Sequence, residues 1–196
     1  MKIGLYFGTF NPIHVGHLII ANHMVEYSDL DQIWMVVTPH NPHKVKANLV
    51  NNHHRLHMVH LATQGYDKIK PSDVEFRLSQ PNYTVNTLAH LEEKFPKHEF
   101  CLIMGEDNLK SLHKWKNYEL ILERYAIYVY PRISEGDVEN QFINHVNIHK
   151  VDAPIVEISS TFIRENVKLG KNITPMIDYK VWEYIDHNLF YKKTRL

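Results

Sequence analysis

The chain has 196 residues, 44% of them hydrophobic, and its 22 basic and 22 acidic side chains leave no formal net charge. This balance is typical of a globular protein, and it lacks the basic excess of proteins that bind nucleic acid or an anionic membrane. The single Cys101 excludes an internal disulfide and fits a reducing cytoplasm, and no apolar run has the length of a membrane span or the form of a leader peptide. We therefore expect one cytoplasmic domain over residues 1–196.

The first half of the chain alternates predicted strands with predicted helices. Residues 3–7 form an apolar run typical of a buried strand, and residues 18–25 form a longer run that predicts a helix. The remaining elements expected here are a strand over 31–37, a Pro-rich loop over 38–44, a helix from Asn51 or Asn52 to Gly65, a strand or extended edge over 74–78, and a helix from about 83 to 95.

The second half continues the alternation. It predicts a strand over 100–104, a short helix through 120–122, strands over 125–130 and 146–150, a surface loop over 134–141, and helices from about 158 and from about 176 to 188. Strands that alternate with helices predict an α/β fold: a doubly wound, Rossmann-like parallel sheet. The C-terminal helices are expected to pack beside that sheet.

The connection between the first strand and the first helix, residues 8–17, carries the strongest functional signal. Gly8 and Gly16 allow a ligand to approach the main chain, and unpaired N–H groups at a helix start favour an anion. His14 and His17 are three residues apart, so both imidazoles can face one side of the first helical turn. This pattern predicts a phosphate chain bound by amides and two imidazoles; the alternative is an ordinary strand-to-helix turn with two hydrogen-bonded histidines.

A second helix start, residues 158–164, offers another place for phosphates. The hydroxyl groups of Ser159, Ser160 and Thr161 lie at the helix start, and Arg164 follows one turn later. Such a group suits the β- and γ-phosphates of a nucleotide and a departing pyrophosphate. The alternative is a serine cap with an arginine that faces solvent.

These segments together resemble a known family. Residues 8–18, 39–44, 81–88 and 158–164, with Gly105-Glu106-Asp107 and Trp115 near Tyr118, are similar in order and spacing to the bacterial nicotinate-nucleotide adenylyltransferases of the nucleotidylyltransferase superfamily. The chain departs from them at Phe7 and Asn11, where a glycine and an aspartate are more usual. Asn11 removes a carboxylate from the turn, so no role of that charge is transferred.

The resemblance implies transfer of the adenylyl group of ATP, with Mg²⁺, to nicotinate mononucleotide, giving deamido-NAD and pyrophosphate. The phosphate of the mononucleotide would attack the α-phosphorus in line. The implied catalytic residues are His14, His17 and Arg164; the implied ATP-binding residues are Gly8, Thr9, Phe10, Gly16, Gly105, Asp107, Ser159, Ser160 and Thr161; the implied mononucleotide-binding residues are Lys44, Thr84, Trp115 and Tyr118. The alternatives are a helix cap for Asp107 and for Thr84, a packing role for Trp115, and a solvated Lys44.

Other functions stay open. An adenylyltransferase for nicotinamide mononucleotide or for phosphopantetheine would use the same phosphate site. A non-catalytic metal-binding protein is a further alternative, because the chain has 15 histidines and His53, His54, His57 and His60 recur at helical spacing. No cysteine or carboxylate completes a zinc set nearby, so we assign no residue to a metal. The sequence also leaves a homo-oligomer open.

Overall fold

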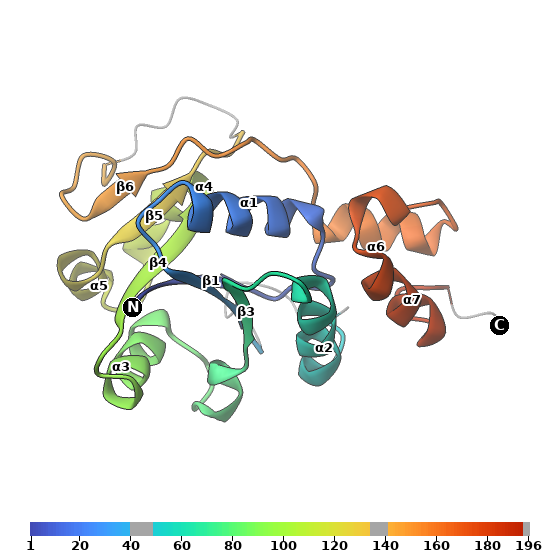
Figure 1. Cartoon of the computed structure of the whole chain (residues 1–196), viewed down its shortest axis with the longest axis horizontal. Helices are drawn as coiled ribbons and strands as arrows, with labels where there is room; N and C mark the ends of the chain where they lie inside the picture. The colour runs from blue at the N-terminus through green and yellow to red at the C-terminus, as the bar shows by residue number, and fades with distance from the viewer. Residues whose placement is uncertain (40–48, 134–140, 194–196) are drawn as a thin grey trace.

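The computed structural model describes residues 1–39, 49–133 and 141–193. Its centre is a sheet of six parallel strands in the order β3-β2-β1-β4-β5-β6 (Figure 1). The strands are β1 (Lys2–Gly8), β2 (Gln32–Val37), β3 (Ile69–Ser72), β4 (Glu99–Gly105), β5 (Ile127–Tyr130) and β6 (Ile148–Lys150). The chain winds outward from β1 to β3 and then returns to β4 on the other side of β1. This reversal makes the carboxyl ends of β1 and β4 the place where open α/β sheets bind ligands.

The described helices connect and flank these strands. They are α1 (Val15–Glu26), α2 (Asn52–Thr63), α3 (Thr84–Lys94), α4 (Glu106–Lys110), α5 (Tyr118–Arg124), α6 (Ser160–Lys168) and α7 (Tyr179–His187), with 3₁₀ helices η1 (Val74–Arg77), η2 (Leu112–Lys114) and η3 (Thr174–Met176). Helices α6 and α7 lie together at one end of the molecule, next to α2 (Figure 1). The structure therefore confirms the doubly wound sheet with C-terminal helices at its side.

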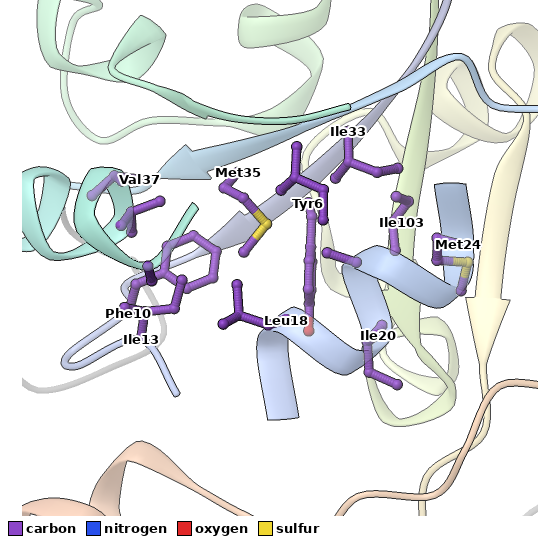
Figure 2. Packing of buried hydrophobic residues seen from close by; sticks show 14 of the residues in the cluster. Tyr6, Phe10, Ile13, Leu18, Ile20, Met24, Ile33, Met35, Val37 and Ile103 are labelled. Carbon is purple, nitrogen blue, oxygen red and sulfur yellow. The ribbon is translucent and has the colours of Figure 1, made fainter. Parts of the chain in front are cut away.

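Apolar side chains divide between the two faces of the sheet because successive residues of a strand point in opposite directions. In β1, Leu5 belongs to a core shared with α3 and α5, whereas Tyr6 belongs to a core shared with α1, α2, α6 and α7. Figure 2 shows Phe10 and Ile13 gathered with Leu18 of α1 against Met35 and Val37 of β2. The turn after β1 is thus seated on the hydrophobic core.

The prediction of a strand over 74–78 is wrong. These residues form η1, in which Glu75 is only 2% exposed and accepts a hydrogen bond from the Thr87 hydroxyl of α3 at 2.8 Å. The strand lies earlier, at Ile69–Ser72, and it contains Pro71. A proline lacks the N–H that a central strand must donate, but β3 is an edge strand, where a proline is tolerated.

The short helix α4 was also not expected. It begins directly after β4 and spans Glu106–Lys110, where the sequence suggested only the end of a strand. Across residues 1–39, 49–133 and 141–193, no helix combines the length and the apolar character that crossing a membrane would require.

Candidate active site

The turn between β1 and α1 folds around the ring of Phe10. This side chain is 1% exposed and lies edge-on to the rings of Tyr6 and His17, with centroids 6.0 and 5.0 Å away. Phe10 has a left-handed backbone conformation, with φ 44°. A Cβ on Gly8 would lie 2.7 Å from the Phe10 ring, so only glycine fits there. The burial of Phe10 therefore shapes the turn.

His14 and His17 lie together at the start of α1, as expected. His14 is the N-cap residue, and its backbone N–H donates to Nδ1 of His17 at 3.2 Å. The ring centroids are 3.7 Å apart with an angle of 30° between the planes. A Cβ on Gly16 would lie 3.0 Å from Nδ1 of His14, which explains the glycine between the two histidines.

His14 is buried and carries an unused polar atom. It is 5% exposed, and its Nδ1 has no hydrogen-bond partner among the described residues. Burial lowers the pKa of His14 to about 4, and the positive charge of Arg132 adds to this effect. The imidazole is therefore neutral at pH 7.

Arg132 is a residue that the sequence analysis missed. It follows β5 and Pro131, and together with both histidines, Tyr6 and Tyr130 it lines a small recess at the carboxyl edge of the sheet. Its Nη1 donates to the Val156 carbonyl at 3.5 Å. A cation directly after a buried strand of a parallel sheet was the signal that could have identified it.

Helix α6 binds directly to this turn. The Ser160 hydroxyl donates to the Pro12 carbonyl at 2.8 Å, and Nη1 of Arg164 donates to the Asn11 carbonyl at 2.8 Å. Ser159 caps α6 by accepting from the N–H of Phe162 at 3.1 Å, and Nη2 of Arg164 donates to the Thr161 hydroxyl at 3.1 Å. The serine cap is real, but Arg164 faces the turn and not only solvent. The structure thus joins the two predicted phosphate-binding segments.

Asn11 holds the C-terminal tail at the same turn. Its Oδ1 accepts from the Tyr191 hydroxyl at 2.8 Å and from the N–H of Val50 at 3.3 Å. The residue that departs from the related family's pattern is therefore a hydrogen-bond acceptor in this protein. Tyr191 had no sequence signal, because nothing near it in the chain carries recognisable chemistry.

Gly105 and Asp107 lie where β4 ends and α4 begins. A Cβ on Gly105 would lie 2.5 Å from Oδ1 of Asp107, so the carboxylate lies directly over the glycine. Gly105 itself is the N-cap residue of α4, and Asp107 is exposed in the first turn. The helix-cap alternative for Asp107 is therefore wrong, and its carboxylate stays open to solvent at the sheet edge.

The residues predicted to bind the mononucleotide are only partly brought together. Thr84 is the first residue of α3, but it is not the cap: Tyr83 is the N-cap residue, and no side-chain bond caps the helix. Nζ of Lys116 lies 4.5 Å from the centroid of the Tyr83 ring, which places the loop with half-buried Trp115 beside the start of α3.

Tyr118 makes its main ring contact elsewhere. Tyr118 packs on Phe142 instead, with ring centroids 5.7 Å apart, and lines a separate surface recess. Lys44 lies outside the described residues.

Three of the four histidines of α2 lie against aromatic rings. Nδ1 of His54 lies 2.7 Å from the Tyr184 hydroxyl, the His57 ring lies 4.5 Å from the Tyr184 ring, and the His53 ring lies 5.6 Å from the Phe76 ring. In the described part of the chain, no group of three or more His, Cys, Asp or Glu side chains is arranged to hold a metal ion. These contacts give His54 and His57 a packing role between α2 and α7.

Comparison with known proteins gives the family of this chain. Residues 5–166 match the cytidylyltransferase-like family. A probable nicotinate-nucleotide adenylyltransferase of Flavobacterium psychrophilum is 71% identical, covering 98% of this chain and 100% of its own length; that of Bacteroides fragilis is 44% identical, covering 94% and 90%. The solved nicotinic acid mononucleotide adenylyltransferase of Plasmodium falciparum, complexed with NaAD, is 21% identical and shares the fold with a TM-score of 0.80 over 97% of both chains. The chain therefore belongs to the cytidylyltransferase-like family and, within it, to the nicotinate-nucleotide adenylyltransferases.

Proposed function

We propose that this protein transfers the adenylyl group of ATP to nicotinate mononucleotide, releasing pyrophosphate and forming deamido-NAD. The observation that carries the proposal is the bonding of α6 to the β1–α1 turn through Ser160 and Arg164, which would make one cationic cradle for a polyphosphate. The cradle lies at the carboxyl edge of β1, where the strand order reverses. The names of the relatives supply the identity of the acceptor.

The proposed reaction needs positioned donors and no general base. A phosphate oxygen of the mononucleotide forms a bond to the α-phosphorus while the bond from that phosphorus to pyrophosphate breaks. The attacking phosphate is already ionised at pH 7. Negative charge grows on the oxygens around the α-phosphorus, and donors fixed in advance lower the barrier. His17 would donate there, and buried His14 would lie beside it at the start of α1.

The rest of the cradle would bind the two ends of ATP. Arg164, with Ser159, Ser160 and Thr161 at the start of α6, would hold the β- and γ-phosphates and the leaving pyrophosphate. Exposed Asp107 would accept from the ribose hydroxyls. Mg²⁺ would arrive with ATP and be held mainly by phosphate oxygens and water, since Mg²⁺ keeps several waters in most sites.

The mononucleotide would bind next to ATP, between the start of α3 and the loop of Trp115. Backbone N–H groups at Thr84, where α3 begins, would donate to the nicotinate carboxylate, and the Trp115 ring would stack on the pyridine. Tyr118 and Lys44 stay candidates for this substrate. Nicotinate mononucleotide and ATP are both metabolites of the cytoplasm. The thiol of Cys101, which is buried and free, also stays reduced in that compartment.

The test is release of pyrophosphate from ATP-Mg with nicotinate mononucleotide, nicotinamide mononucleotide or phosphopantetheine as acceptor, and without acceptor as control. The amide would leave buried donors mispaired, which costs about 1–3 kcal/mol. We therefore expect kcat/KM to favour the acid by about tenfold or more. Equal values, or a preference for another acceptor, would overturn the assigned acceptor. No release with any acceptor would overturn adenylyl transfer altogether.

A further inference from the structure

Arg55 of α2 is a buried arginine whose donors are all used. Its side chain is 0% exposed, and each of its five N–H groups donates a hydrogen bond. The acceptors, at 2.5–3.0 Å, are the carbonyls of Thr9, Thr38, Pro39 and Val50 and Oδ1 of Asn52. The guanidinium group is therefore fixed in one orientation.

No acceptor of Arg55 carries a negative charge. Four are carbonyls and one is an amide, and the ion pairs among the described residues do not include Arg55. Residues 40–48, which follow Pro39, contain no Asp or Glu. Burial lowers the pKa of Arg55 to about 10, so it is still charged at pH 7. A buried cation without a counter-charge is costly, and an anionic ligand nearby would offset that cost.

Arg55 holds the turn that is proposed to bind the phosphates of ATP, so the anionic ligand would be that polyphosphate. Its Nη1 holds Thr9, inside the turn that carries His14 and His17, and the same nitrogen holds Thr38 at the end of β2. Arg164 holds Asn11 in the same turn from α6. The turn is therefore bound by two arginines, one exposed in part and one fully buried behind it.

We propose that Arg55 is a positioning residue for adenylyl transfer: it fixes the turn of residues 8–17 and supplies a buried positive charge that the polyphosphate of ATP neutralises. The inference rests on the proposed function. Arg55 would make two contributions. Its five hydrogen bonds set the geometry of the turn, and its charge attracts ATP from a distance. A residue that only stabilised the fold would leave the affinity of the folded protein for ATP unchanged.

The test compares Arg55→Gln, which removes the charge, with Arg55→Lys, which keeps the charge but cannot reach five acceptors. The control is Met58→Ala, on the same helix and equally buried, whose apolar side chain carries no charge and donates no hydrogen bond to the turn. Binding of ATP-Mg is measured by calorimetry without the mononucleotide, and kcat by pyrophosphate release, at a temperature where circular dichroism shows each variant folded. We expect Arg55→Gln to raise the Kd for ATP about tenfold or more, and Arg55→Lys to bind ATP within about threefold of the original chain but to lose about tenfold in kcat. Met58→Ala should bind ATP normally.

The outcomes separate this inference from the proposed function. If the original chain neither binds ATP nor releases pyrophosphate, the proposed function fails. If it does both and Arg55→Gln binds ATP within twofold, or Met58→Ala weakens ATP as much, the inference about Arg55 alone is overturned. Should the Arg55 variants not fold, Asn52→Ala decides, because it removes one acceptor of Arg55 at the half-buried first residue of α2. A several-fold lower kcat with normal ATP binding supports the inference, and an unchanged kcat overturns it.

Discussion

The candidate site has a phosphate side, formed by the turn of residues 8–17 and the start of α6, and a base side, formed by the start of α3 and the loop of Trp115. The two sides differ in how many bonds hold them to the rest of the fold. On the phosphate side, Asn11 and His14 are buried, and the turn is bonded to α2, α6 and the C-terminal tail. On the base side, Trp115 is half-buried and its neighbour Lys116 is exposed, with a cation–π contact to Tyr83 joining that loop to α3.

This difference matches what each side is proposed to do. Charge stabilisation in a transition state depends on donors fixed before the reaction, which requires a rigid support. Recognition of the pyridine ring depends on contacts that bind substrate and transition state alike, which affects KM more than kcat. Changes on the phosphate side should therefore reduce turnover or stability, and changes on the base side should weaken binding of the mononucleotide.

The largest effect is expected for His17→Ala. Loss of one donor to a developing oxyanion typically reduces kcat by about 10²–10³. The variant should fold, because His17 is half-buried and its neighbours in the core are unchanged. Steady-state pyrophosphate release measures kcat, and His23→Ala, a half-buried histidine further along α1, is the matched control. Turnover near the original value would remove His17 from the mechanism.

His14 should make the fold sensitive to acid. Its pKa is about 4 in the folded protein and 6.5 in the unfolded chain. Between these values the unfolded state binds the extra proton, so stability is lost as the pH falls below 6.5. At about 1.4 kcal/mol per pH unit, the loss reaches about 3 kcal/mol near pH 4.

Urea unfolding at pH 7 and pH 4.5 measures this loss, and His14→Asn is the comparison, since it removes the titrating group while other groups still titrate. The free energy of unfolding should fall more steeply with acid in the original chain than in the variant. Parallel curves would show that His14 is not held neutral.

Arg164→Ala should weaken ATP and pyrophosphate binding by about 10- to 100-fold, because a hydrogen bond to a charged group contributes about 1.5–3 kcal/mol. Binding of nicotinate mononucleotide should change much less. Arg164→Lys should restore binding only in part, since lysine cannot bond to both the Asn11 carbonyl and a phosphate with a planar fork. Calorimetry with each ligand separates these results, and unchanged ATP affinity would contradict the role.

On the base side, Trp115→Ala should raise KM for the mononucleotide by about tenfold, the scale of one aromatic stacking contact on a base. The Kd for ATP and kcat at saturation should change little. Trp115→Phe keeps an aromatic ring and should retain most of the affinity. If Trp115→Ala reduced kcat as strongly as His17→Ala, the two sides would not differ as described.

The smallest effect is expected for Tyr191→Phe. It removes one hydroxyl that donates to Asn11, and such a hydrogen bond contributes about 1 kcal/mol to the free energy of unfolding. Denaturant unfolding should detect this loss, with kcat reduced by no more than about threefold. Tyr66→Phe, at the surface, is the control. Equal stability of the two variants would show that the tail does not strengthen the turn.

The sequence by itself determined the alternation of strands and helices and the chemistry of the two helix starts. Residues 8–17 and 158–164 were recognisable because glycines, hydroxyls and histidines lie within one or two turns of each other. The order and spacing of these segments also indicated the family. Such signals are local, since they depend on a hydrophobic period or on a cap a few residues long.

The tertiary structure decided what surrounds and fixes those segments. The 74–78 pattern favoured a strand, but residues 74–77 form a 3₁₀ helix in which Glu75 is buried and bonded to Thr87. The partners that hold the turn come from far along the chain: Arg55 is 46 residues from Thr9, and Tyr191 is 180 residues from Asn11. No local period or cap records such bonds, because each donor meets its acceptor only after the sheet and its helices have packed together.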